Sequence, residues 1–143
     1  GRDLDILLIE KALLKRNILL LKGMGGTGKT TLLNYLREWW QVTNFAEEIF
    51  YFGYDVKAHT LQQIVNEIGK QIYNRFQAMD PTAQWRKLSQ KLRTEAYILI
   101  LDNLESVTGQ PLTIQNTLDE SAREEIKKFL ASLVGGKTKV VLG

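Results

Sequence analysis

A glycine-rich segment near the start of the chain holds the residue types that phosphate chemistry requires. Residues 23–30 read GMGGTGKT and match the pattern G-x-x-x-x-G-K-[ST] at every fixed position. Glycines let a backbone curl so that several N–H groups face one phosphate, with no Cβ atom in the way. A helix that starts there adds the positive end of its dipole. The pattern predicts a phosphate-binding loop, because a chain of this length matches by chance only about once in two hundred sequences.

Each residue after the glycines has a role in that prediction. The Lys29 ammonium group is expected to reach the β- and γ-phosphates of a nucleotide, and the Thr30 hydroxyl to bind Mg²⁺. Thr31 lies one residue further into the helix, where it is placed to meet the α-phosphate. The loop residues expected to bind the nucleotide are Gly25, Gly26, Thr27, Gly28, Lys29, Thr30 and Thr31.

The second candidate is Asp102, an acidic residue that directly follows the apolar residues 97–101. Ligands of open α/β sheets bind at the carboxyl ends of strands, where a carboxylate can hold the water shell of magnesium. The next residue, Asn103, cannot act as a base, so we expect slow hydrolysis. Glu105 is the nearest carboxylate for orienting the attacking water, and its alternative is a solvated loop residue. The expected metal ligands are Thr30 and Asp102, and the expected catalytic residues are Lys29, Asp102 and Glu105.

Four apolar runs, and the helical patterns between them, must position these residues. The expected strands are residues 18–21, 48–54, 96–102 and 139–142. Apolar residues at helical spacing fill the segments between the strands. Strands that alternate with helices predict a three-layer α/β fold with a parallel sheet and right-handed crossovers.

Capping residues mark several of the expected helix starts. Thr60 and Ser121 each lie three residues before a Gln or Glu, which is the spacing of a capping box. Asp80-Pro81 offers an N-cap followed by a proline at the first helical position. The helix after Thr60 is expected to run to Phe76, with Gly69 as a weak point inside it.

Composition excludes several other classes of protein. The chain has 143 residues, no Cys, one His and a net charge of +3. It is long enough for one domain with a real core, and without Cys it cannot use thiol catalysis, Cys-ligated zinc or an iron–sulfur cluster. The uncharged apolar runs, such as residues 18–21, are far shorter than the roughly 20 residues that span a bilayer. We expect one cytoplasmic domain over residues 1–143, and a fragment of a larger multidomain protein.

Three segments together resemble a known family. They are Gly1-Arg2-Asp3, the phosphate loop with the start of its helix at residues 23–33, and Leu99-Ile100-Leu101-Asp102-Asn103-Leu104-Glu105. In order and spacing they resemble the nucleotide-binding domain of STAND NTPases, the signalling ATPases related to NB-ARC and AAA+ proteins. The resemblance spans essentially the whole chain.

The resemblance implies a Mg²⁺-dependent ATP/ADP switch on a P-loop NTPase sheet with the strand order 2-3-4-1. It also implies that Gly1 and Arg2 lie near the adenine, although a solvated terminal residue is the alternative for Arg2. The implied partners are an adenine nucleotide and other domains of the same chain, namely further subdomains, a repeat sensor and an effector. A homo-oligomer on activation is also allowed. In relatives, a sensor of the γ-phosphate follows the last strand, and here the sequence stops at Gly143, one residue after that strand.

Two further function classes share the phosphate loop. One is the ATPase core of a nucleic-acid-dependent machine, such as a helicase or clamp loader, and one helix does carry a basic side with Arg86, Lys87, Lys91 and Arg93. No aromatic platform accompanies that basic side. The other class is a small-molecule kinase or GTPase, but the chain has no Asn-Lys-x-Asp sequence for reading guanine and no arginine-rich lid. We expect neither a membrane nor a nucleic acid as a partner.

Overall fold

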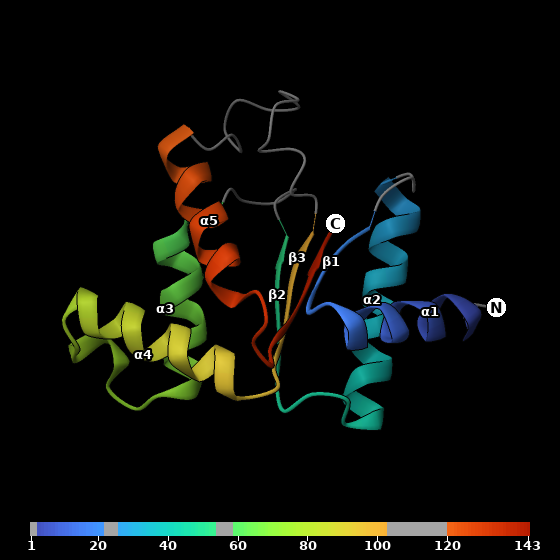
Figure 1. Ribbon diagram of the computed structural model, residues 1–143, viewed down its shortest axis with the longest axis horizontal. Helices are drawn as coiled ribbons and strands as arrows, with labels where there is room; N and C mark the ends of the chain where they lie inside the picture. The colour runs from blue at the N-terminus through green and yellow to red at the C-terminus, as the bar shows by residue number, and fades with distance from the viewer. Residues whose placement is uncertain (1–2, 22–25, 54–58, 103–119) are drawn as a thin grey trace.

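The computed structural model describes residues 3–21, 26–53, 59–102 and 120–143 of the chain. Within these ranges the strands are β1 (Ile18–Leu20), β2 (Ile49–Gly53), β3 (Ile98–Asp102) and β4 (Lys139–Leu142). The helices are α1 (Asp3–Lys15), α2 (Gly26–Thr43), α3 (Leu61–Ile72), α4 (Pro81–Thr94) and α5 (Glu120–Leu133). A short 3-10 turn, η1 (Phe76–Ala78), links α3 to α4. The chain therefore alternates strands with helices (Figure 1).

The strands of the described ranges form one parallel sheet in the order β1-β4-β3-β2. β2 and β3 pair from Ile49 opposite Ile98 to Gly53 opposite Asp102. β4 lies between β3 and β1. The predicted α/β class and the predicted strand order are both confirmed. Because the strands are parallel, their carboxyl ends all lie at one edge of the sheet, and Asp102 lies at that edge.

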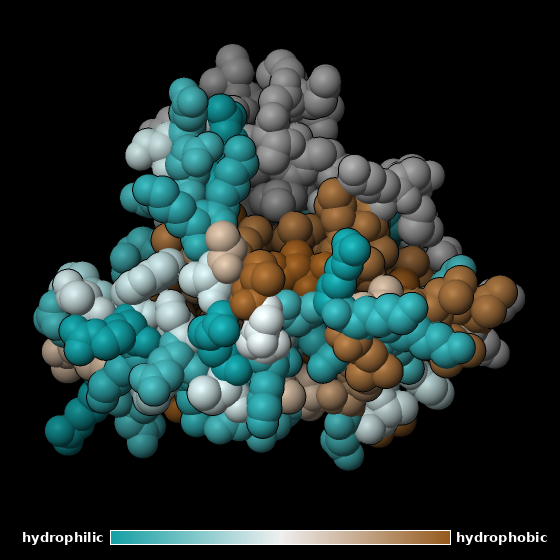
Figure 2. Space-filling view, viewed as in Figure 1, coloured by the Kyte–Doolittle hydropathy of each residue, from teal (hydrophilic) through white to brown (hydrophobic). Residues whose placement is uncertain are grey.

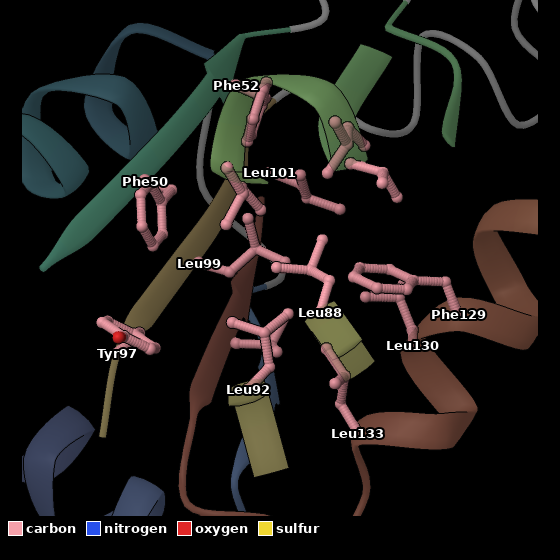
Figure 3. Close-up of a cluster of buried hydrophobic side chains, with 14 of the residues drawn as sticks. Phe50, Phe52, Leu88, Leu92, Tyr97, Leu99, Leu101, Phe129, Leu130 and Leu133 are labelled. Carbon is pink, nitrogen blue, oxygen red and sulfur yellow. The ribbon is translucent and has the colours of Figure 1, made fainter. Parts of the chain in front are cut away.

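Helices cover both faces of the sheet, α1 and α2 on one side and α3, α4 and α5 on the other (Figure 1). Alternation along β3 sends Leu99 and Leu101 into the cluster beneath α3, α4 and α5, which is the cluster shown in Figure 3. Ile98 and Ile100 belong to the opposite cluster, with α1 and α2. Asp102 continues this second series, so the strand directs its carboxylate to the side that α2 covers.

Side-chain caps start two of the helices as predicted. Thr60 and Gln63 form the reciprocal capping box, with the Gln63 N–H donating to Thr60 Oγ1 at 3.3 Å and the Thr60 N–H donating to Gln63 Oε1 at 2.9 Å. Asp80 accepts from the N–H groups of the first turn of α4. The prediction for Ser121 is wrong: α5 already includes Glu120, so Ser121 lies inside the first turn instead of capping it.

Gly69 has a packing role that the sequence analysis did not assign. The helix that begins after Thr60 ends at Ile72 instead of reaching Phe76, and Phe76 opens η1. The Phe76 ring folds back onto α3, where a Cβ atom added at Gly69 would lie 2.3 Å from Phe76 Cε2. Glycine therefore permits a close approach of the ring, and Gly69 is required by packing and is not a weak point.

Helix α1 was missed because its leucines and its charged residues are mixed around the helix. Ile6, Ile9 and Leu13 are buried against α2 and the sheet. The other leucines of α1 are exposed, together with one of β1, and Figure 2 shows this apolar surface along both elements: Leu4, Leu7, Leu8, Leu14 and Leu20. A helix whose charged residues do not gather on one face has only a weak 3.6-residue period, so the pattern that reveals amphipathic helices is absent.

Candidate functional site

The carboxyl edge of the sheet gathers the candidate residues, and the first of them is Lys29. Helix α2 begins at Gly26, and Lys29 lies in its first turn. Only 4% of Lys29 is exposed. Lysine is almost never this buried unless its charge has partners, because removing an ammonium group from water costs free energy. The first turn of a long helix also carries N–H groups and the positive end of the dipole, which attract an anion to the same place.

Asp102 is the last residue of β3 and is fully buried. Its oxygen Oδ2 accepts a hydrogen bond of 2.6 Å from the Tyr51 hydroxyl. Tyr51 lies on β2, the strand beside β3, where it is paired with Ile100. A bond this short to a carboxylate is typical of a charge-assisted hydrogen bond. The carboxylate is therefore held in one orientation at the edge of the sheet.

Gly143 brings Lys29 and Asp102 to the same small space. It follows β4, and its N–H donates to the Leu101 carbonyl at 2.8 Å, which fixes it beside the end of β3. A Cβ atom added to Gly143 would lie 3.0 Å from Asp102 Oδ1, 3.1 Å from Leu33 Cδ1 and 3.3 Å from Lys29 Cδ. The stem of the lysine and an oxygen of the aspartate thus both adjoin the position that a larger residue would fill.

This arrangement fits a nucleotide with magnesium. Lys29 supplies a cation at a helix start, which suits a phosphate, and Asp102 supplies the hard oxygen that Mg²⁺ prefers. Among the residues that the structure describes, no three His, Cys, Asp or Glu side chains gather as a metal-binding group. A magnesium ion held here would take most of its ligands from water and phosphate oxygens, as is usual when the ion accompanies a nucleotide.

Comparison with protein families shows which family this sequence belongs to. The sequence model of the AAA domain matches residues 13–141. The chain belongs to the AAA domain family. AAA domains are generally ATPases. A search of curated proteins found no match to the chain. In the described part of this AAA domain, no helix is both long enough and apolar enough to cross a membrane.

Part of the predicted site lies within the residues of the AAA domain that the structure describes. Lys29 and Asp102 both lie beside Gly143. The backbone of residues 26–31 forms the start of α2, and the Thr31 side chain is exposed there. The side chains of Thr27 and Thr30 lie outside the described part. Four further candidates also lie outside it, and their predicted roles stay predictions: Gly1, Arg2, Gly25 and Glu105.

Sequence reasoning missed two side chains that the AAA domain adds to this edge. Tyr51 bonds to Asp102, and the Arg37 guanidinium carbon lies 4.3 Å from the centroid of the Tyr51 ring. Residues 48–54 were interpreted only as an aromatic strand, so the Tyr51 hydroxyl had no assigned partner. Side chains alternate along β2, so Tyr51 and Gly53 lie on one face of the sheet. Gly53 pairs with Asp102, and Tyr51 is therefore on the same face as the Asp102 carboxylate. That pairing is the signal that would have revealed Tyr51.

Proposed function

We propose that this AAA domain is the nucleotide-binding switch module of a STAND-type signalling ATPase, which binds ATP or ADP with Mg²⁺ and hydrolyses ATP slowly. The observation that carries the proposal is the meeting of Lys29 and Asp102 around Gly143 at the carboxyl edge of the sheet. Family membership supports ATP as the ligand. The resemblance of the phosphate loop and of residues 99–105 to STAND NTPases supports the signalling role.

Each residue at this edge has a defined task in the proposal. Lys29 neutralises the β- and γ-phosphates, and the N–H groups at the start of α2 bind the same oxygens. Thr30 and Asp102 would hold the magnesium ion, which when bound neutralises charge that develops on the phosphates. Residues Thr27, Gly28 and Thr31 complete the phosphate site, with Gly25 and Gly26 supplying backbone. Gly1 and Arg2 would contact the base.

Slow hydrolysis follows from the residue after Asp102. Asn103 cannot take a proton from water, so this domain has no base directly beyond its acidic strand. Glu105 is the proposed substitute that orients the attacking water. A nucleotide that is hydrolysed slowly can act as a timer, and other domains of the same chain would respond to the change from ATP to ADP.

Calorimetric titration of the chain with Mg·ADP, Mg·ATP and Mg·GDP tests the proposed ligand. We expect both adenine nucleotides to bind, and guanine to bind more weakly. Lys29→Ala should weaken binding about a hundredfold, because a buried phosphate contact from a charged group is lost. Lys127→Ala is the matched control, since Lys127 lies on the exposed surface of α5, paired with Glu124 at 3.4 Å. This control should bind as the wild type does.

Thermal unfolding gives the outcome that would contradict the proposal. A ligand that binds only the folded state raises the melting temperature, so Mg·ADP should raise it for the wild type and not for Lys29→Ala. Equal melting temperatures with and without Mg·ADP would show that this chain is not a nucleotide-binding module.

Hydrolysis assays distinguish the switch from a nucleic-acid-dependent machine. A switch module should turn over ATP slowly, at a rate that double-stranded DNA and single-stranded RNA leave unchanged. Stimulation of turnover by either nucleic acid would instead assign the domain to the second class. Replacing Lys87 on the basic side of α4 with Glu should abolish such stimulation if that side binds phosphates.

A further inference from the structure

Asp102 receives its 2.6 Å hydrogen bond from a residue that belongs to no part of the phosphate loop or the acidic strand. Tyr51 lies in the middle of β2, two residues before Gly53, which pairs with Asp102. Its ring therefore runs along the sheet toward the carboxyl edge, and its hydroxyl meets Oδ2. The opposite oxygen, Oδ1, is the one that adjoins Gly143, where the Lys29 stem also lies. Holding Oδ2 thus determines where Oδ1 points.

The Tyr51 side chain is half-buried on the face of the sheet that α2 covers. Its ring packs against the buried cluster formed by α1, α2 and the sheet, which includes Leu33, Leu36 and Ile100. In such surroundings a hydrogen bond to a carboxylate is stronger than in water, and it fixes the geometry of both partners. A phenylalanine would fill the same space and pack as well, so packing alone does not require the hydroxyl.

Arg37 connects Tyr51 to the helix that starts at the phosphate loop. Its guanidinium group lies over the Tyr51 ring, with Cζ 4.3 Å from the ring centroid, which is the geometry of a cation–π contact. Arg37 is on α2, eight residues or about two turns after Lys29. One rigid helix therefore carries the residue aimed at phosphate and the residue that holds the tyrosine.

We propose that Tyr51 is a positioning residue for magnesium: its hydroxyl orients the Asp102 carboxylate toward the metal, and Arg37 holds the Tyr51 ring against α2. The inference rests on the proposed function, because it assumes that Asp102 serves a magnesium ion. It assigns to α2 a second task beyond phosphate binding. A movement of α2 when the phosphates change would reach Asp102 through Arg37 and Tyr51.

The decisive measurement is the affinity for ADP with and without magnesium. Tyr51→Phe should reduce the gain in affinity that Mg²⁺ provides by about tenfold, since groups that orient a ligand of a metal typically contribute this much. The affinity for ADP in EDTA should stay at the wild-type value, because Lys29 is untouched. Tyr35→Phe is the matched control: Tyr35 is exposed on α2, and its removal should alter neither affinity.

A double-mutant cycle distinguishes positioning from a purely structural role. If Tyr51 acts through Asp102, then Tyr51→Phe in an Asp102→Asn background should cause no further loss of the magnesium effect. Additive losses would contradict the proposal, as would a Tyr51→Phe variant with the wild-type magnesium dependence. Arg37→Gln retains the Tyr51 hydroxyl but removes the cation over its ring, so it should give a smaller loss of about twofold to threefold. It is a second variant if Tyr51→Phe unfolds.

The wild type separates failure of this inference from failure of the proposed function. If the wild type binds no ADP in either condition, the nucleotide site itself is wrong. If it binds ADP equally with and without Mg²⁺, then Asp102 does not serve a magnesium ion. If the wild type shows the magnesium effect and Tyr51→Phe retains it, only the role of Tyr51 is wrong.

Discussion

The two edges of this sheet use their polar residues in opposite ways. At the amino edge, Asn17 lies just before β1 and makes three hydrogen bonds to backbone groups of the turn between α5 and β4. Its Nδ2 donates to the carbonyls of Leu133 and Thr138 at 2.6 and 3.0 Å, and its Oδ1 accepts from the Gly135 N–H at 2.9 Å. At the carboxyl edge, Lys29, Asp102 and Tyr51 are instead aimed at a shared space or at one another.

Polar residues at the amino edge stabilise the fold, whereas those at the carboxyl edge are placed to bind a ligand. Side chains bonded to the backbone tie strands and turns together, and they leave no group directed at a ligand. The buried Thr138 follows the same rule, with its hydroxyl donating to the Glu95 carbonyl at 2.9 Å. A buried cation and a buried carboxylate around one glycine do little for folding, because their desolvation is costly. Mutations at the carboxyl edge should therefore change ligand binding, and mutations at the amino edge should change stability.

The largest effect is expected for Asp102→Asn at the carboxyl edge. The amide keeps the shape of the side chain but loses the charge that attracts magnesium, so the magnesium-dependent gain in ADP affinity should fall about a hundredfold. Asparagine keeps an oxygen that can accept from the Tyr51 hydroxyl, so the free energy of unfolding without nucleotide should change much less than the magnesium effect does. Titrations with and without Mg²⁺, together with urea unfolding, measure both quantities.

Asp5→Asn is the control for the Asp102 experiment, since Asp5 is exposed on α1. It should leave the magnesium effect unchanged. If Asp102→Asn lost much stability and kept the magnesium effect, Asp102 would serve folding and not magnesium binding.

Asn17→Ala at the amino edge should show the reverse behaviour. Loss of three hydrogen bonds, at about 0.5 to 1.5 kcal/mol each, should lower the free energy of unfolding by about 1.5 to 4.5 kcal/mol. The affinity for Mg·ADP should stay at the wild-type value once the protein is folded. Urea unfolding and titration at low temperature test the two halves of this prediction. Asn66→Ala is the control and should be near neutral, because half-buried Asn66 on α3 accepts a hydrogen bond of 3.0 Å from the exposed Gln62 side chain.

Two glycines sharpen the comparison, one at each edge. A Cβ atom at Gly143 would press on Asp102 Oδ1 at 3.0 Å, so Gly143→Ala should displace the carboxylate by a few tenths of an ångström and weaken Mg·ADP binding about threefold to tenfold. At Gly136 the added atom would lie 2.9 Å from the Arg93 Cα, so Gly136→Ala should destabilise the fold by about 1 to 3 kcal/mol. Equal effects of the two variants on binding would remove the distinction between the edges.

The contrast also explains which residues could be predicted from the sequence. Lys29 and Asp102 are fixed by local patterns, a glycine-rich loop before a helix and an acidic residue at the end of an apolar strand. Tyr51 depends on how β2 pairs with β3, and that register is set by contacts between segments about fifty residues apart. No local pattern contains it.

The missed features of the fold have the same physical origin. Propensity identifies Gly69 as unfavourable in a helix, but the ring of Phe76 makes glycine necessary there. The charged residues of helix α1 are spread around it, so its periodicity is weak although its buried residues are spaced normally. In both cases tertiary packing outweighs the local preference that a sequence displays.

The smallest effect is expected at the amino edge from Tyr97, which precedes β3 and is only 7% exposed. Burial first, and then the charges of Glu47 and Glu95, raise the pKa of Tyr97 above its ordinary value of 10.0. Above about pH 10 the unfolded chain therefore loses the phenol proton while the folded chain keeps it, so stability declines as the pH rises further. Tyr97→Phe removes this contribution, and its free energy of unfolding should fall less steeply between about pH 9 and about pH 11.

Urea unfolding of both proteins across that pH range measures the difference in slope. Tyr35→Phe, which removes an exposed hydroxyl from α2, controls for the loss of a phenol as such. Affinity for Mg·ADP at neutral pH should be the same for Tyr97→Phe and the wild type, because Tyr97 lies at the opposite end of β3 from Asp102. Tyr97→Phe could instead change that affinity and leave the pH dependence of the free energy of unfolding at the wild-type value. The amino edge would then take part in binding, and the two edges would not differ in role.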